Sequence, residues 1–265
     1  MELIPRNFES WINGSTGYAS REYAESLGEF GAIRELPRSG GWLLVSETPR
    51  PSLYDGMGCY PLFSCRDWSA LGADLESLAD DLVSVRLVTD PFADVDSSQL
   101  QTAFPDTCYE YKQHFVTDLK VPIESAASSH HRRNARKALD VVAVRQETLN
   151  ATLLENWCSL YDNLIGHHEI GGIARFSPAA FALQWNVPGL VVFSAQDGDE
   201  TCGITLWYIQ GNVVYYHLAA YSDRGYELGA SFALFWTALK HFAELGLRWA
   251  ALGAGAYSPS AACPR

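Results

Sequence analysis

The stretch from Gly203 to Gly255 constrains the fold more than any other part of the sequence. Its apolar and turn residues predict two strands, a glycine-bearing loop, a helix and a third strand, at 203–209, 213–220, 221–230, 231–245 and 247–252. The dipeptide Gly211-Asn212 is typical of the tight turn in a hairpin. A strand, loop and helix in this order form a unit that can hold an anionic ligand at the N-terminus of the helix.

The size and charge of the chain limit its partners. With 265 residues it exceeds the usual size of a single domain, and a hydrophobic content of 48% supplies an ample core. A formal net charge of −12 argues against general binding of nucleic acid, which needs a positive face, and we expect no DNA partner. A small basic pocket remains compatible with this charge.

Targeting and redox features are those of a cytosolic protein. The first ten residues lack the basic region and apolar core of a secretion signal, and no stretch reaches the roughly 20 apolar residues that span a bilayer. The six cysteines have no metal-binding spacing and are expected to be small buried hydrophobic residues. We therefore predict a cytoplasmic protein without a membrane span.

The first half of the chain mixes short helices and strands. Helices are expected over 18–30, with Ser20 as the N-cap, and over 69–82, and strands over 32–36, 41–46 and 83–88. The Pro- and Gly-rich passage from Pro49 to Pro61 is expected to be loop. A change of composition between Pro122 and Ser129 predicts a division into domains 1–122 and 123–265.

The second half opens with the one concentrated basic segment, which we expect to be a helix over 128–139 capped by a serine. An amphipathic helix is predicted over 149–164, and Ser177-Pro178 is typical of the start of a further helix. A buried strand is expected over 190–195, before the hairpin.

The region from about residue 124 to residue 256 resembles a GNAT acyltransferase domain, and more narrowly the FemAB-like branch, which pairs two GNAT-type domains in one chain. The resemblance rests on the order and spacing of Gly203-Ile-Thr-Leu-Trp-Tyr, Val214 to Ser222, Leu228 to Trp236 and Gly246 to Gly255, and on the basic helix Arg132 to Ala138. It implies a mixed α/β fold of tandem GNAT-like halves, with the first half divergent.

The phosphate-binding loop departs from the family pattern. The family has Arg or Gln followed at fixed spacing by two small residues, which let backbone N–H groups approach a pyrophosphate. Here Arg224-Gly-Tyr-Glu-Leu-Gly229 keeps the arginine and the last glycine but places Glu227 at the middle position. A carboxylate there repels pyrophosphate, which weakens the case for acyl-CoA and suits a FemAB-like enzyme whose donor is aminoacyl-tRNA.

The resemblance also implies site residues. In the GNAT plan a splayed strand supplies a backbone N–H to the donor carbonyl, expected around Leu206, Trp207 and Tyr208. The helix start at Gly229, Ala230 and Ser231 is expected to hold anionic groups of the donor, and Arg224 to contact phosphate. A phosphate-bearing substrate is expected on the basic helix, at Arg132, Arg133, Arg136 and Lys137.

Two side chains are candidates for proton transfer. Tyr257 follows the last strand and is a candidate to protonate a leaving thiolate or hydroxyl, against the alternative of a half-buried tyrosine after a turn. His217, within the second strand of the hairpin, is a candidate base, against the alternative of a satisfied core histidine. His167-His168-Glu169 does not suggest a metal, because adjacent histidines face different sides of a helix.

We therefore predict an N-acyltransferase that moves an acyl or aminoacyl group to a small-molecule or peptide amine by direct attack. Acyl-CoA is the expected co-substrate, and no resident cofactor or metal is expected. The alternatives are an aminoacyl-tRNA-dependent FemAB-type peptidyltransferase, with tRNA as donor carrier, and a GNAT-like protein that binds a ligand without turnover. The family usually has a further strand and helix after the position of Gly255, so the acceptor side is expected to be incomplete; this and Glu227 favour the binding-only alternative.

Overall fold

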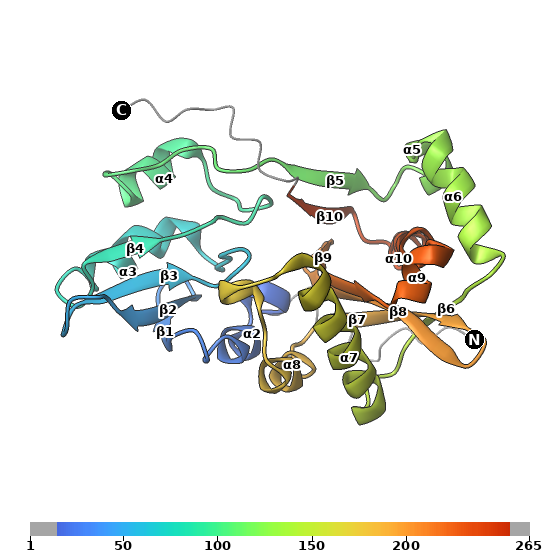
Figure 1. Ribbon diagram of the computed structural model, residues 1–265. Coiled ribbons are helices and arrows are strands. Elements are labelled where there is room, and N and C mark those ends of the chain that lie inside the picture. Colours follow the sequence, from blue (N-terminus) through green and yellow to red (C-terminus); the bar gives the residue numbers. More distant parts are fainter. Residues whose placement is uncertain (1–14, 255–265) are drawn as a thin grey trace.

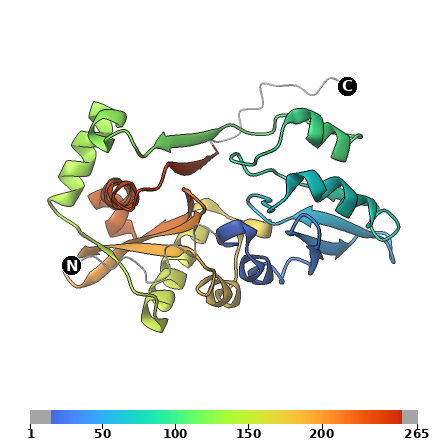
Figure 2. The same ribbon diagram turned by 180° about the vertical axis from the view of Figure 1, so that it is seen from behind.

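Two β-sheets lie side by side in the computed structural model, which describes residues 15–254 (Figures 1 and 2). The first sheet has four strands in the order β1-β2-β3-β4, and the second has six in the order β5-β10-β9-β8-β7-β6. This arrangement confirms the predicted mixed α/β fold with two sheet-based halves. None of the described helices is long and apolar enough to cross a membrane.

The first sheet is built mainly from antiparallel neighbours, with β4 added parallel to β3. Its strands are β1 (Ala32–Leu36), β2 (Gly41–Glu47), β3 (Tyr54–Gly58) and β4 (Ser84–Arg86). The helices of this half are η1 (Gly17–Ala19), α2 (Arg21–Ser26), η2 (Trp68–Ala70), α3 (Leu71–Glu76) and α4 (Ser97–Ala103). Ser20 caps α2 as predicted, since its side chain accepts a hydrogen bond from the Tyr23 backbone N–H.

Strand β3 lies inside the passage that the sequence analysis expected to be loop. The segment was expected to be loop because glycine is typical of turns. In the sheet its glycines allow close packing: a Cβ at Gly58 would lie 2.9 Å from side-chain atoms of both Phe63 and Leu87. Pairing with β2 and β4 on both edges holds this segment extended despite its low strand propensity.

The second sheet contains the hairpin and the strands around it. Its strands are β5 (His114–Asp118), β6 (Ala143–Gln146), β7 (Leu190–Asp197), β8 (Glu200–Gln210), β9 (Val213–Tyr221) and β10 (Trp249–Ala254). β5 precedes residue 122 but pairs antiparallel with β10, so this sheet begins before the predicted domain division at 122–123. The division itself stays a prediction.

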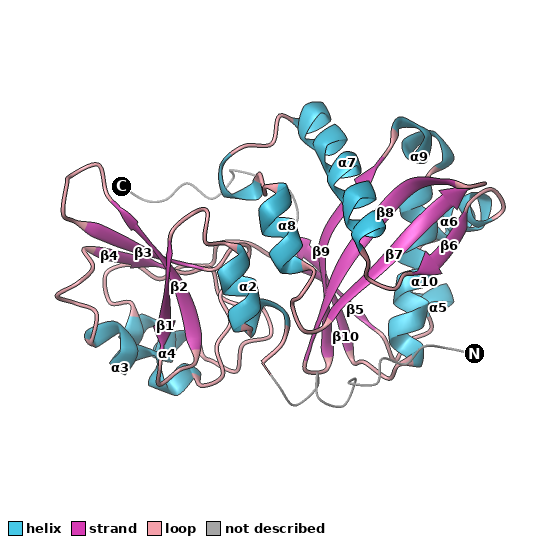
Figure 3. Ribbon diagram, turned by 90° about the horizontal axis from the view of Figure 1, so that it is seen from below, coloured by secondary structure: helices cyan, strands magenta, loops and turns pink. Residues whose placement is uncertain are grey.

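Helices cover both faces of the second sheet (Figures 1 and 3). Its helices are α5 (Ile123–Ala126), α6 (Ser129–Leu139), α7 (Ala151–His168), η3 (Gly172–Ala174), α8 (Pro178–Gln184), α9 (Asp223–Leu228) and α10 (Ala230–Glu244). α6 and α10 pack on one face, around Trp207 and Phe242. α7 and α8 pack on the other, around Trp157 and Tyr208, in the same core cluster as α2 from the first half. The two halves are therefore joined by apolar packing.

Local signals set several helix starts. Asn150 caps α7, and its buried residues Leu153, Trp157, Leu160 and Tyr161 form the predicted apolar face. Ser177 caps α8 with Pro178 in its first turn, as predicted.

Candidate functional site

The second sheet opens between β9 and β10. β9 pairs antiparallel with β8 over its whole length, but it pairs parallel with β10 only from Val213 to Tyr215. Beyond Tyr215, the described residues give β9 no strand partner on the edge that faces β10. Backbone groups on that edge are therefore available to a ligand.

A β-bulge lies at the opening. Leu206 is opposite Leu218 while Trp207 is opposite Tyr216, so His217 is the extra residue on β9. A bulge bends its strand and re-aims the neighbouring side chains, and bulges are common beside active sites. The break in the β9 ladder thus coincides with the start of its open edge.

The open edge lies one strand later than the sequence analysis placed it. Leu206, Trp207 and Tyr208 are fully buried on β8, an interior strand that is paired with β7 on one side and β9 on the other. Their backbone groups take part in these two ladders. The strand separation expected at these residues is therefore wrong, and the structure has it at β9 instead.

The segment after β9 is wound into helix instead of forming an open loop. Ser222 caps α9, accepting from the backbone N–H of Gly225 at 3.2 Å, and Gly229 ends the helix in a left-handed conformation. α10 begins directly afterwards at Ala230 without a side-chain cap. The Phe232 N–H donates to the Gly229 carbonyl oxygen at 3.0 Å, so the first-turn N–H groups left for an anion are those of Ala230 and Ser231. Gly229, Ala230 and Ser231 thus lie at a helix start, where the sequence analysis expected an anion site.

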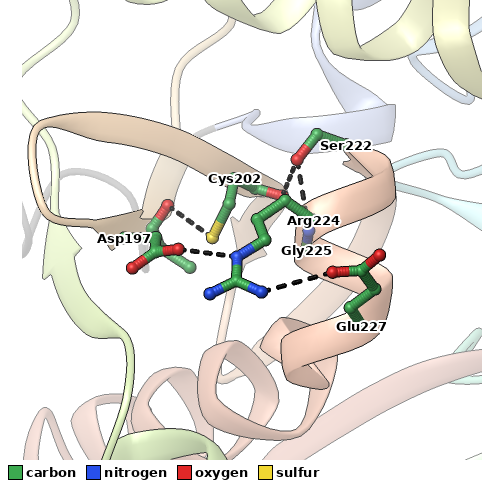
Figure 4. A network of polar contacts seen from close by, with 7 residues as sticks. Asp197, Cys202, Ser222, Arg224, Gly225 and Glu227 are labelled. Atoms are coloured by element: carbon green, nitrogen blue, oxygen red, sulfur yellow. Dashed lines mark hydrogen bonds and ion pairs between the residues drawn. The ribbon is translucent and has the colours of Figure 1, made fainter.

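Arg224 is held by two carboxylates (Figure 4). Its Nε lies 2.8 Å from Asp197 Oδ2, and one terminal nitrogen lies 3.2 Å from Glu227 Oε2. The hydrogen bond to Asp197, followed by that to Glu227, raises the pKa of Arg224. A phosphate would have to compete with both partners for this guanidinium. The positive charge of the segment expected to bind pyrophosphate is therefore neutralised by the protein's own carboxylates, Asp197 and Glu227.

Helix α9 is seated directly on β8. The carbonyl oxygen of Cys202 accepts from the Ser222 backbone N–H at 3.1 Å, and a Cβ built on Gly225 would lie only 2.0 Å from the same oxygen. Close approach at Gly225 therefore fixes the position of α9 against the sheet.

The basic helix α6 lies beside the start of α10. The rings of His130 and His131 are 6.2 and 6.0 Å from the ring of Phe232 in the first turn of α10. Arg132 is half-buried and donates to the Glu124 and Ala127 carbonyls at 3.0 and 2.7 Å, so it closes the end of α5.

The other predicted basic residues form an exposed group that we call the α6 basic face: Arg133, Arg136 and Lys137. Within residues 15–254, none of the three has a carboxylate partner. In a chain of net charge −12, three unneutralised cations on the side of α6 opposite its buried residues Ala135 and Ala138 are a local site for polyanions.

His217 is buried in a neutral hydrogen-bonded cluster. Its Nδ1 lies 3.1 Å from the Tyr18 hydroxyl, and its Nε2 lies 3.3 Å from Gln184 Oε1. Burial lowers the pKa of His217 to about 3. Since the amide oxygen of Gln184 can only accept, Nε2 carries the proton and Nδ1 accepts from Tyr18. Both nitrogens are engaged, which favours a structural role; the candidate acid Tyr257 lies outside the described residues.

A loop of the first half reaches the opening. Asp90, which is 5% exposed, accepts from the Tyr215 hydroxyl at 2.8 and 2.9 Å, and from Gln210 Nε2 at 3.1 Å. The Phe92 ring lies 6.0 Å from the Tyr215 ring on β9 and 6.3 Å from the Trp249 ring on β10, so it packs against both strands over their short paired stretch. Asp90 was not a candidate in the sequence analysis, because its partners Tyr215 and Gln210 lie far away in the chain.

Within the described residues, no group of three or more His, Cys, Asp or Glu side chains could hold a metal ion. The candidate site therefore comprises the open edge of β9, the start of α10 and the Asp90–Phe92 loop, and the α6 basic face is a separate surface on the outer side of α6. Together they offer backbone donors, cations and the polar groups at the seam between the halves.

Comparisons with known proteins place this arrangement in a family. The model of the family described as "Acetyltransferase (GNAT) domain" matches residues 125–258. Among curated proteins, none matches this chain in sequence.

Solved structures show the same fold over nearly the whole chain. The FemX crystal structure is 12% identical with a TM-score of 0.64, covering 98% of this chain and 90% of that one. The C-terminal domain of a protein assigned as a lysylphosphatidylglycerol synthetase from Agrobacterium fabrum is also 12% identical with a TM-score of 0.64, covering 96% and 78%. L-PGS from Bacillus licheniformis is 11% identical with a TM-score of 0.62, covering 94% and 80%. The predicted FemAB-like arrangement of the fold is thereby confirmed.

Proposed function

Because this chain belongs to the acetyltransferase (GNAT) domain family, we propose that it is an aminoacyltransferase that moves an aminoacyl group from aminoacyl-tRNA to an amine acceptor by direct attack. This proposal takes the alternative of the sequence analysis in place of acyl-CoA. The observation that carries it is the neutralised loop: Arg224 is held by Asp197 and Glu227 in a wound helix, where a CoA-binding loop needs open backbone and a free cation.

The α6 basic face supports a large polyanionic donor. Arg133, Arg136 and Lys137 are exposed and have no carboxylate partner in the described residues, and they lie on the helix that packs beside the start of α10. Cations on one helix face suit the regularly spaced phosphates of an RNA stem. The fold shared with FemX and with lysylphosphatidylglycerol synthases agrees with this donor class.

In the proposed mechanism the ester end of the donor enters the opening between β9 and β10. A backbone N–H on the open edge of β9, after Tyr215, donates to the ester carbonyl and stabilises negative charge on its oxygen. The first turn of α10, at Gly229, Ala230 and Ser231, holds the phosphate nearest the ester.

The acceptor nitrogen then attacks the ester carbon, forming the C–N bond as the C–O bond to the ribose breaks. The nitrogen loses one proton and the leaving ribose oxygen gains one, with Tyr257 as the proposed donor to that oxygen. No covalent intermediate with the protein is required.

Two assays test the donor class. The first follows transfer of labelled amino acids from a mixed aminoacyl-tRNA pool to glycinamide and lysinamide, in parallel with labelled acetyl-CoA. The family match keeps acyl-CoA as the second candidate donor. Transfer from tRNA with none from acetyl-CoA is the expected result, and transfer from acetyl-CoA alone would overturn the proposal.

The second assay measures tRNA affinity against salt concentration. The triple variant Arg133→Gln, Arg136→Gln, Lys137→Gln is expected to weaken binding and to reduce the slope of log affinity against log salt by up to about 3, since each lost phosphate contact removes roughly 0.9. The matched control, Arg21→Gln, Arg34→Gln, Arg50→Gln, makes the same charge change in the first half. An equal loss in both variants would mean that only net charge matters, and the α6 basic face would have no specific role.

A further inference from the structure

His114 lies on β5, the edge strand that pairs with β10 on the side away from the opening. In the β5–β10 ladder it lies opposite Ala254, two residues from Val116, which lies opposite Ala251. Side chains alternate along a strand, so His114 and Val116 share the face on which Ala251 and Trp249 join the core between the halves. His114 therefore faces the first half, beside the Asp90–Phe92 loop.

The His114 ring has an unused nitrogen. Its Nδ1 is buried and has no hydrogen-bond partner among residues 15–254. A buried polar atom without a partner is rare in folded proteins and calls for a physical account. By contrast His217, the histidine that the sequence analysis considered as a base, has both ring nitrogens hydrogen-bonded.

The surroundings of His114 keep it neutral. Burial lowers its pKa from the ordinary value, Asp90 acts to raise it, and Lys112 acts to lower it. The remaining titratable groups nearby are Tyr215, which is hydrogen-bonded to Asp90, and the ion pair of Asp118 with Arg248 further along the same two strands. At pH 7 the imidazole is thus available to accept a proton.

We infer that His114 is the general base that takes the proton from the attacking amine. The inference rests on the proposed function and assigns a residue to its acceptor side. Opposed side chains in antiparallel strands have Cβ atoms about 4.5–5.5 Å apart, and Ala254 places only a methyl group opposite the ring. Ala254 is at the end of β10, where the strand has parted from β9.

The proton count is balanced by this assignment. The amine nitrogen forms the bond to the ester carbon and gives its proton to Nδ1 of His114, while the ribose oxygen leaves and takes up one proton. His114 then releases its proton to solvent and the acid that protonated the ribose oxygen regains one from solvent, so the enzyme ends in its starting state. Asp90 lies close enough to favour the charged imidazolium that exists between these steps.

The test is the pH dependence of kcat/KM for lysinamide with aminoacyl-tRNA as donor. Wild-type activity is expected to rise through an apparent pKa below 6.5. His114→Gln is expected to lose about 100-fold or more of kcat and to lose this acidic limb. Lys112→Gln, at an exposed position, removes a charge that lowers the pKa of His114, so its limb is expected at higher pH with activity retained. His168→Gln, also exposed, is the control that changes neither property.

A histidine ring titration by NMR on the free protein separates the two proposals. The His114 ring is expected to titrate below pH 6.5 in the wild type and higher in Lys112→Gln. If the wild type transfers an aminoacyl group and His114→Gln keeps both its rate and its acidic limb, His114 is not the base. If the wild type transfers nothing, the proposed function fails, and a His114 pKa at or above 6.5 would independently overturn the assignment.

Discussion

Replacing Gly225 by alanine tests whether α9 is seated on β8 as the structure describes. The new Cβ would lie 2.0 Å from the carbonyl oxygen of Cys202, whereas ordinary contact begins at 3.4 Å, so α9 must retreat by about 1.4 Å. Overpacking of this kind typically costs about 1–3 kcal/mol. In a chain of this size that corresponds to a fall in Tm of roughly 2–12 °C.

The same displacement would move the start of α10, which follows α9 without a connecting loop. Misplacement by about 1 Å can cost on the order of 100-fold in rate, so transfer should fall by about that factor beyond any loss of folded protein. Thermal unfolding followed by circular dichroism measures the first effect, and single-turnover transfer at a temperature where both proteins are folded measures the second.

The control is Gly166→Ala in α7, where a new Cβ would meet nothing within 4 Å. It should raise stability by up to about 1 kcal/mol, as expected for an exposed helical position. If Gly225→Ala unfolds at the wild-type temperature and transfers at the wild-type rate, α9 is not packed on Cys202 and the reasoning fails.

Three further predictions concern the seam and the loop. The pKa of His217 is about 3 in the folded protein and 6.5 when unfolded, so the free energy of unfolding should fall by about 1.4 kcal/mol per pH unit as the pH drops from 6.5 toward 3. Urea titrations across this range should show a weaker dependence of that free energy on pH in His217→Gln. The same pH dependence in both proteins would contradict burial of a neutral ring. Asp90→Asn places an amide against the Tyr215 hydroxyl and the Gln210 amide, and should cost about 2–4 kcal/mol in equilibrium unfolding, compared with little change in Asp94→Asn. Glu227→Gln releases one partner of Arg224 and should increase any stabilisation by CoA in thermal unfolding; no gain, with tRNA binding intact, would show that the Arg224 pairing does not decide the donor class.

Local sequence signals predicted several elements in both halves. The turn at Gly211-Asn212, the caps Ser20 and Ser177, and the apolar face around Trp157 act over a few residues, so they are legible in the sequence and recur in the structure. The helix expected over 231–245 is α10, at Ala230–Glu244.

Features that depend on distant partners were missed. The Gly-rich β3 is a strand because β2 and β4 hold both its edges, and no neighbouring residue announces this. The opening was predicted at β8 but lies at β9, because its position depends on which strand loses its partner early. Asp90 meets Tyr215 across the seam, a contact between residues that are remote in the chain.

The position of β5 has a consequence for how the chain is synthesised. Its partner β10 follows more than 130 residues later in the chain, so a nascent chain leaving the ribosome exposes β5 until Trp249–Ala254 have emerged. Phe115 is 66% exposed and Val116 43% exposed even in the folded protein, so β5 is prone to aggregation while it is unpaired. We expect chains halted before Trp249 to aggregate or to be held by chaperones, so in this protein the length of chain already made decides when the sheet can be completed.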